Sequence, residues 1–414
     1  MAIKAGLLFD YKKICRKAKK GDRKMKNFKK FLSVVLAALM VAGCVALSSC
    51  GKNGGETASD ELLIGGIGPL TGDYANYGNS VKNGAELAVS EINAAGGVNG
   101  FKFKLSYQDS KGNNADAVAA YGKLVDNGMK LSLGGVLSGE TADIVAAAKD
   151  DGLLVLTPSG SATNILQGND SAFRVCFSDA SQGVASANYI GEHNLPQKVA
   201  VFYQSDIDYS TGLLENFKAS AAANGIEIVE EQSFTTDTRT DFTTQITAIQ
   251  NSGAELVFIP IYAAEAATFL TQAKGKFSSD MIYFGCDGLD GILTKIKDSA
   301  DAENVMLLTP FSADSKDEKV QKFVSDYKAK YNSVPDQFAA DGYDAVYALK
   351  AAVEKAGLKP DDMADFNTRV VGAMTQIEVA GVTGNMTWSA DGETTKGALA
   401  MIIHDGVATL YGQD

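Results

Sequence analysis

Two short segments rich in glycine and hydroxyl side chains are candidates for binding chemistry. Residues 134–141 read GGVLSGET and residues 157–163 read TPSGSAT, and each follows an apolar run and leads into a predicted helix. In an open α/β sheet, turns at the carboxyl ends of strands form the ligand crevice. A serine hydroxyl beside the unpaired N–H groups of a helix start can hold a carboxylate. The alternative is that Ser138 and Ser161 only cap their own helices, which is the commoner use of such a serine.

Residues suited to catalysis are scarce by comparison. The chain has two histidines, His193 and His404, and it has neither a phosphate-binding P-loop nor a GxSxG nucleophile turn. Gly66, Gly68 and Gly72 are spaced GxGxxxG, which is not the GxGxxG spacing of a dinucleotide loop. A Ser–His or Cys–His nucleophile is therefore improbable. We expect no enzyme activity and no cofactor.

The cysteines give no sign of a metal site either. Cys15, Cys44 and Cys50 fall in the first 50 residues, and Cys176 and Cys286 fall in the rest. None forms a CxxC pair, and two histidines are too few for a zinc-type cluster, so we expect no metal. A disulfide between the last two cysteines is one alternative, and a pair of buried free thiols is the favoured one.

The elements that must position these turns alternate along the chain. Apolar runs that predict strands lie at residues 62–67, 101–107, 131–136, 153–157, 198–203, 226–228, 256–262, 281–285 and 305–308. Several are continuously apolar, as in parallel strands covered on both faces. Between them, Val81, Ala85, Ala88, Ile92 and Ala95 recur at helical spacing before Gly96 and Gly97. Strand–helix alternation predicts doubly wound α/β sheets, and about 350 residues are enough for two of them.

Charge separates the N-terminal 50 residues from the rest. Residues 1–30 carry 12 Lys/Arg and 2 Asp/Glu, and residues 31–50 carry no charge. Residues 51–414 hold 26 basic and 48 acidic side chains, a formal net charge of −22. Such an acidic surface repels nucleic acid and anionic lipid, so neither is an expected partner of the folded part.

The basic start at Lys26, Lys29 and Lys30 followed by an uncharged run predicts an export signal, although the run is also long enough for a membrane span. Small residues precede Cys44 and Cys50, as in a lipoprotein cleavage box. We favour Cys50 as the lipidated residue, because the polar, glycine-rich residues 51–60 after it form a flexible tether. Residues 1–24 are interpreted as a misassigned extension ahead of a true start at Met25.

From residue 62 to the C-terminus, the sequence resembles the type I substrate-binding proteins of ABC importers, on the leucine/isoleucine/valine-binding branch. The strongest stretch is IGGIGPLTGDYANYGNSVKNGAELAVSEINAAGGVNG at residues 64–100, followed by YQDSKGNNADAV and LLVLTPSGSAT. The Tyr-Gly pair, the Asn-Gly-Ala helix and the Ile-Asn-x-x-Gly-Gly-x-x-Gly ending occur together in that family. As a set they are far more specific than any single glycine.

The resemblance implies two doubly wound parallel-sheet lobes with the ligand in the cleft between them. The first lobe would comprise residues 61–177 and 311–382, and the second residues 178–310 and 383–414. Three crossings would join the lobes near residues 177–178, 310–311 and 382–384.

The resemblance also implies roles in binding an amino acid. Ser138 matches a hydroxyl that binds the carboxylate, Ser159 a position whose backbone carbonyl takes the ammonium, and Ser161 a residue that contacts both groups. On the second lobe, Tyr209 matches a tyrosine that seals the cleft. Asp287 matches an acidic residue that pairs with the ammonium, although an aspartate before Gly288 is also an ordinary turn former.

The side-chain pocket is implied at four positions, Tyr77, Val136, Leu137 and Tyr262, whose ordinary use would be core packing. Glu140 departs from the small polar residue usual in the family and bears on specificity.

The implied function is that of a monomeric, lipid-anchored, extracytoplasmic receptor that delivers aliphatic amino acids to ABC permease and ATPase subunits. Two alternatives keep the fold: a receptor for another small solute, such as an amide, a short-chain acid or an aromatic amino acid, and a sensor for a membrane kinase or chemoreceptor. An enzyme is the third alternative, disfavoured by the missing catalytic residues.

Overall fold

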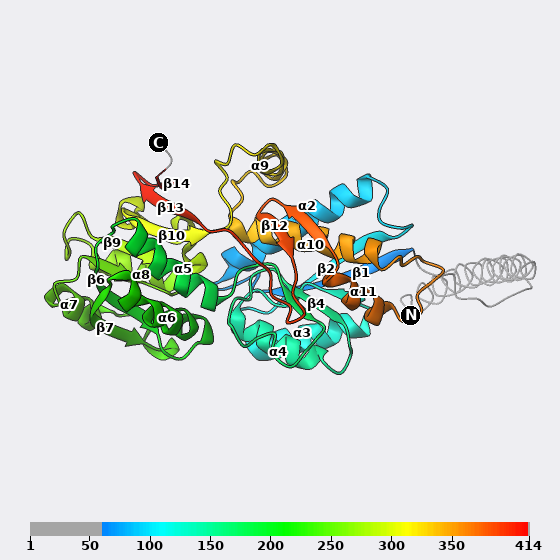
Figure 1. Ribbon diagram of the computed structural model, residues 1–414, viewed down its shortest axis with the longest axis horizontal. Coiled ribbons are helices and arrows are strands. Elements are labelled where there is room, and N and C mark those ends of the chain that lie inside the picture. Colours follow the sequence, from blue (N-terminus) through cyan, green and yellow to red (C-terminus); the bar gives the residue numbers. More distant parts are fainter. Residues whose placement is uncertain (1–59, 413–414) are drawn as a thin grey trace, which may run out of the picture. The chain divides into compact units, whose positions relative to one another are not determined.

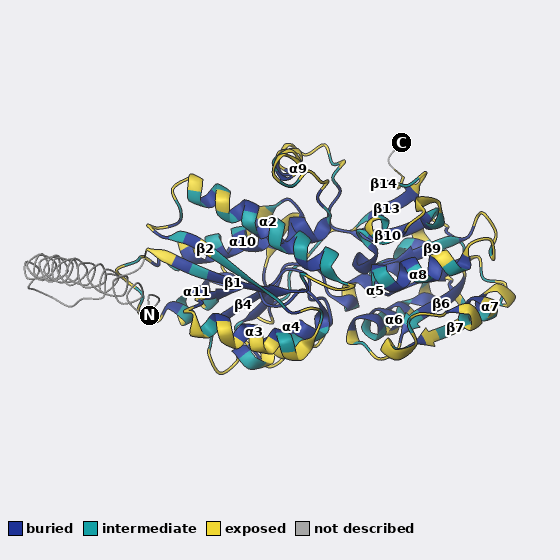
Figure 2. Ribbon diagram, turned by 180° about the vertical axis from the view of Figure 1, so that it is seen from behind, coloured by how far each residue is buried: buried dark blue, intermediate teal, exposed yellow. Residues whose placement is uncertain are grey.

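The computed structural model describes residues 60–412 (Figures 1 and 2). The predicted export signal, the predicted cleavage box with Cys44 and Cys50, and almost all of the predicted tether lie outside the described residues. The described part contains two α/β lobes, each built on its own sheet, and this confirms the predicted fold class. No helix in residues 60–412 is long and apolar enough to cross a membrane.

The sheet of the first lobe has five parallel strands in the order β2-β1-β3-β4-β5. Their bounds are β1 Glu61–Gly68, β2 Lys102–Asp109, β3 Leu131–Ser132, β4 Leu154–Thr157 and β5 Ala172–Arg174. The first four coincide with predicted strands, whereas β5 has only three residues and no apolar run that would predict it.

The sheet of the second lobe has seven strands in the order β14-β13-β10-β9-β8-β6-β7. Their bounds are β6 Lys198–Gln204, β7 Glu227–Phe234, β8 Leu256–Phe258, β9 Ile282–Gly285, β10 Val305–Thr309, β13 Leu399–His404 and β14 Val407–Leu410. The five strands from β7 to β10 run parallel, and the two C-terminal strands add an antiparallel edge beside β10. That edge was not predicted.

Helices cover both faces of each sheet (Figure 1). Those of the first lobe are α2 Ala75–Ala94, α3 Asn114–Asp126, α4 Ser138–Ala148, α9 Glu318–Tyr331, α10 Gln337–Lys355 and α11 Phe366–Met374. Those of the second are α5 Asp179–Glu192, α6 Asp208–Ala221, α7 Thr243–Asn251 and α8 Ala263–Ala273. The predicted apolar stripe of α2 is buried from Val81 to Ile92, and the helix ends before Gly96 and Gly97, both at positive φ.

The chain passes from the first lobe to the second between β5 and α5, and returns after β10, where Phe311 joins the first lobe's core. The last crossing differs from the expected one at residues 382–384. There β11 (Glu378–Gly381) turns back into β12 (Gly384–Thr387), its antiparallel partner.

Two contacts hold the following segment on the first lobe. The Trp388 indole N–H donates to the carbonyl of Arg174, 2.8 Å away, and Glu393 forms an ion pair with the Arg174 guanidinium at 3.1 Å. The chain therefore crosses only after Glu393 and before Leu399.

Candidate functional site

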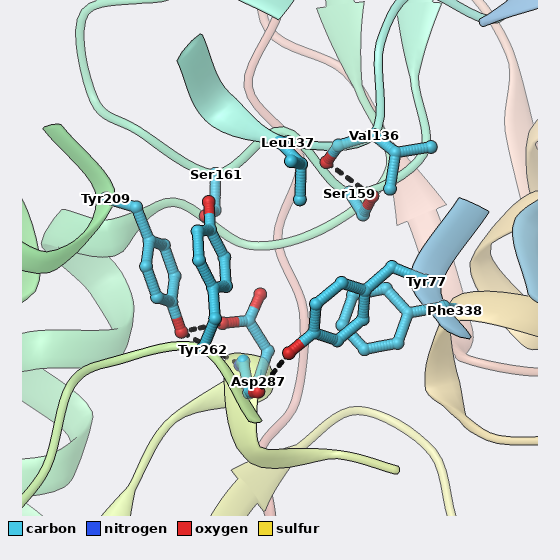
Figure 3. A pocket seen from close by; sticks show the side chains of 10 residues that line it. Tyr77, Val136, Leu137, Ser159, Ser161, Tyr209, Tyr262, Asp287 and Phe338 are labelled. Atoms are coloured by element: carbon cyan, nitrogen blue, oxygen red, sulfur yellow. Dashed lines mark hydrogen bonds between the residues drawn. The ribbon is translucent and has the colours of Figure 1, made fainter. Parts of the chain in front are cut away.

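The predicted binding residues converge on one pocket between the lobes (Figure 3). Eight of the nine line it, together with Gly288 and Phe338: Tyr77, Val136, Leu137, Ser159, Ser161, Tyr209, Tyr262 and Asp287. The ninth, Ser138, lies behind the Ser161 turn and is 2% exposed. The pocket lies at the carboxyl ends of strands from both sheets, as expected of a crevice in open α/β sheets.

The wall from the first lobe is made by the two glycine- and serine-rich turns. The Ser138 Oγ accepts hydrogen bonds from the backbone N–H groups of Ser161 (3.2 Å) and Ala162 (3.1 Å). The Ser159 hydroxyl donates to the carbonyl of Val136 at 2.9 Å. These bonds join the two turns into one surface, from which Ser159 and Ser161 line the pocket.

Capping, the alternative use of these serines, is wrong for both. The α4 helix begins at Ser138, with Leu137 at its N-cap position, and the Ser138 hydroxyl bonds to the neighbouring turn rather than to its own helix. No helix follows Ser161, because residues 163–168 form turns, so the helix predicted there is also wrong.

Arg174 explains the path of the second turn. Its guanidinium is fully buried and donates to the carbonyls of Gly160 (3.3 Å), Ser161 (2.6 Å) and Ala162 (3.1 Å). In a trans peptide the N–H points opposite to the C=O. Because Arg174 takes the carbonyls of Gly160 and Ser161, the N–H groups of Ser161 and Ala162 point the other way, toward Ser138. No sequence pattern indicates this role, since Arg174 ends a strand of only three residues.

The wall from the second lobe is built around Asp287, which begins the short 3₁₀ helix η3 (Asp287–Leu289) after β9. The Tyr209 hydroxyl donates to Asp287 Oδ1 at 2.8 Å and accepts from the N–H of Gly288 at 2.8 Å. The Asp287 N–H donates to Gln182 Oε1 at 3.1 Å. Burial raises the pKa of Asp287 to about 6, against the lowering effect of hydrogen bonds from Tyr209 and Gln182.

Aromatic rings close the sides of the pocket. The rings of Tyr209 and Tyr262 stack with centroids 4.6 Å apart, as Figure 3 shows. Tyr77, on α2 of the first lobe, donates its hydroxyl to the carbonyl of Gly288 (2.6 Å) and accepts from the N–H of Ala263 (2.8 Å). Tyr77 therefore bridges to the second lobe and holds the two walls together.

A second buried carboxyl, Asp179, was missed by sequence reasoning. It is fully buried at the start of α5. Burial raises its pKa well above the usual range and the charge of Asp287 raises it further, against the lowering effect of the Ser161 hydroxyl. An aspartate after Ser178, which caps α5, reads as an ordinary helix start, so no pattern could single it out.

Glu140 lies beside the pocket rather than in it. It is 1% exposed on the first turn of α4, and burial raises its pKa to about 7, against the lowering effect of the Ser110 hydroxyl and the Leu137 N–H. Glu140 belongs to the wall of a larger cavity of about 490 Å³ that shares Leu137, Tyr209 and Tyr262 with the pocket. We call this cavity the vestibule.

The space left inside the pocket itself is about 10 Å³, room for about one water molecule. A solute can therefore enter only when the lobes part. Hydroxyl groups on one wall and the carboxyl group of Asp287 on the other suit a small molecule that carries both an anionic and a cationic group. No group of His, Cys, Asp and Glu in residues 60–412 could hold a metal ion. Cys176 and Cys286 are both buried and free, as favoured from the sequence.

Comparison with known proteins gives the same family. A family model described as periplasmic binding protein matches residues 61–405. The "Leucine-, isoleucine-, valine-, threonine-, and alanine-binding protein" of Pseudomonas aeruginosa is 30% identical over 80% of this chain and 86% of its own length. "Leu/Ile/Val-binding protein homolog 3" of Brucella melitensis is 29% identical over 82% of this chain and 90% of its own.

A solved structure agrees with these relatives. It is the branched-chain amino acid transporter substrate binding protein LivJ of Streptococcus pneumoniae in complex with isoleucine. It superposes with a TM-score of 0.77 at 29% identity, covering 84% of this chain and 99% of its own. The chain thus belongs to the periplasmic binding protein family, among relatives named as leucine-, isoleucine- and valine-binding proteins.

Proposed function

We propose that this protein is the extracytoplasmic receptor of an ABC importer and that it captures branched-chain or other aliphatic amino acids by lobe closure. The observation that carries the proposal is the opposition of the two walls. A donor-rich turn surface held by Ser138 and Arg174 faces the carboxyl of Asp287 across a pocket with apolar and aromatic sides. Relatives named for leucine, isoleucine and valine support the same ligand class.

In this proposal the carboxylate of the amino acid binds the first lobe, at the hydroxyl groups of Ser138 and Ser161. The ammonium binds the carbonyl of Ser159 and the carboxylate of Asp287, with the buried carboxyl of Asp179 nearby. The side chain packs among Tyr77, Val136, Leu137 and Tyr262. Closure removes water from the charges, which strengthens each pairing. The ligand then stabilises the closed form because it binds both walls only there.

The first test is a thermal melt of residues 51–414 after unfolding and refolding to strip any bound ligand. An amino acid at 100 times its Kd should add about 2.7 kcal/mol, which is a shift of a few degrees. A shift with leucine, isoleucine or valine supports the proposal. A shift only with other amino acids revises the pocket, and no shift with any amino acid rejects the ligand class.

Asp287→Ala should abolish that shift while the unliganded melt stays cooperative, because the ammonium loses its ionic partner. The matched control is Asp143→Ala, a carboxylate exposed on α4, which should keep the full shift. If Asp287→Ala binds as tightly as the control, the ammonium is held elsewhere.

We further propose that the protein is held at the membrane by a lipid on Cys50 and hands its ligand to permease and ATPase subunits. Cys50→Ser in the full chain should move the protein from the membrane fraction to the soluble fraction and remove labelling by a fatty-acid probe. Persistent labelling would point to Cys44, for which Cys44→Ser is the matched variant.

A further inference from the structure

At the outer edge of the vestibule, Arg239 connects the two lobes. It lies on the second lobe between β7 and α7, and its Nη2 forms an ion pair with Asp73 Oδ2 at 3.0 Å. Its Nη1 donates to the Tyr74 hydroxyl (3.0 Å) and to Glu265 Oε1 (2.9 Å). The Tyr74 hydroxyl in turn donates to Glu265 Oε1 at 2.9 Å. We call Asp73, Tyr74, Arg239 and Glu265 the latch.

The latch spans the cleft. Asp73 and Tyr74 lie between β1 and α2 on the first lobe, whereas Arg239 and Glu265 belong to the second. Glu265, 2% exposed at the start of α8, holds Arg239 within its own lobe, so the guanidinium is already oriented toward its partners. Lys295 of the second lobe adds a hydrogen bond to the backbone carbonyl of Asp73. All the contacts to Asp73 and Tyr74 are lost when the lobes part.

Aromatic rings link the latch to the pocket. The Tyr74 ring packs edge-on against Tyr262 with centroids 5.2 Å apart, and Tyr262 stacks on Tyr209, which donates to Asp287. Neither Arg239 nor Asp73 lines the pocket itself, and both line the vestibule beside it. Arg239 therefore acts on closure without lying where a solute would be held.

We propose that Arg239 is a positioning residue that fastens the lobes in the closed form and so sets how long a captured solute stays. This proposal rests on the proposed function, in which the solute is held by lobe closure. An interaction that exists only in the closed form shifts the opening equilibrium by its own free energy. Because a solute leaves only from the open form, losing the latch speeds dissociation more than it slows association.

The test compares Arg239→Met with Arg369→Met. Both arginines form an ion pair at 3.0 Å and are similarly exposed, 29% and 30%, but Arg369 pairs with Asp362 inside the first lobe. With L-leucine, L-isoleucine and L-valine as probes in a rapid chase, Arg239→Met should raise the dissociation rate about tenfold. Arg369→Met should stay within about twofold of the unaltered protein.

Two further readouts separate a latch from a merely structural role. Raising the salt concentration should speed dissociation from the unaltered protein and have less effect on Arg239→Met, because the Arg239–Asp73 pair is partly exposed and is screened. Glu265→Gln, which keeps a hydrogen-bond acceptor for Tyr74 but removes the charge, should give an intermediate rate.

The ligand-free protein provides a test that does not depend on the solute. In X-ray scattering at low salt, Arg239→Met should show a larger radius of gyration than the unaltered protein and than Arg369→Met. Equal radii, or equal dissociation rates, overturn the latch. If the unaltered protein binds none of the three probes, the proposed ligand class fails, and the scattering result alone decides the latch.

Discussion

At residue 287 a carboxyl group is held out of water, beside a tyrosine hydroxyl and near a second buried carboxyl. Burial raises the pKa of Asp287 to about 6. Relative to an ordinary aspartate at 3.8, its ionisation in the folded protein costs about 3 kcal/mol of stability above pH 6. That cost disappears as the pH falls toward the unfolded value. A cationic ligand group offsets the same cost at neutral pH.

This predicts a pH dependence of binding. An ammonium group needs the ionised form of Asp287, and protonation competes with it, so the affinity should fall as the pH drops through about 6. Isothermal titration with leucine between pH 5 and pH 8 measures it. Ser138→Ala should weaken binding at every pH and keep the profile, whereas Asp287→Asn should bind weakly and flatten it. A profile unchanged in Asp287→Asn would assign the titration to another group.

At the scale of elements, the crossing of α2 and α10 is set by glycines. A Cβ on Gly84 would lie 1.8 Å from the carbonyl oxygen of Ala339, and one on Gly342 would lie 2.4 Å from that of Val81. Both neighbours are backbone atoms, which cannot turn aside as a side chain can. The two helices therefore pack backbone to backbone. This packing brings Tyr77 of α2 and Phe338 of α10 into contact with each other in the wall of the pocket.

Gly84→Ala should destabilise the protein by about 1–3 kcal/mol, because the helices must move apart to admit the methyl group. Gly122→Ala on α3 is the matched control: its Cβ would meet nothing within 4 Å, so the substitution should stabilise by about 1 kcal/mol. Urea unfolding measures both. A neutral Gly84→Ala would mean that α10 shifts without strain.

Elements with a strong periodic pattern were predictable from the sequence. All nine predicted strands form, and the apolar stripe of α2 is buried from Val81 to Ile92, whereas its last predicted member, Ala95, is exposed just past the helix end. The failures are segments whose structure depends on partners outside the segment itself. The path after Ser161 depends on the Arg174 guanidinium, and β12 depends on pairing with β11, so local pattern carries no information about either.

The residues of the site likewise separate into those that local sequence predicts and those that it does not. Family motifs picked out eight residues that line the pocket, because those positions carry recognisable local sequence. Asp179, Arg174 and the latch were missed, since each acquires its surroundings only when parts of the chain far apart in sequence come together.

At the scale of the whole molecule, the described residues form two lobes, and the chain crosses between them three times. The first lobe's core draws on residues from Leu62 to Trp388. The segment with Glu393 returns to Arg174 beside the first crossing before it enters the second sheet. Opening of the lobes must therefore bend all three crossings together, and Glu393 connects one of them directly to the Ser161 turn through Arg174.

Trp388 lies near the end of the sequence but belongs to the core of the first lobe, and this affects when that lobe can fold during synthesis. The ribosome builds most of the second lobe before it adds the residues that complete the first lobe's core. A nascent chain cannot close that core until nearly its whole length has emerged.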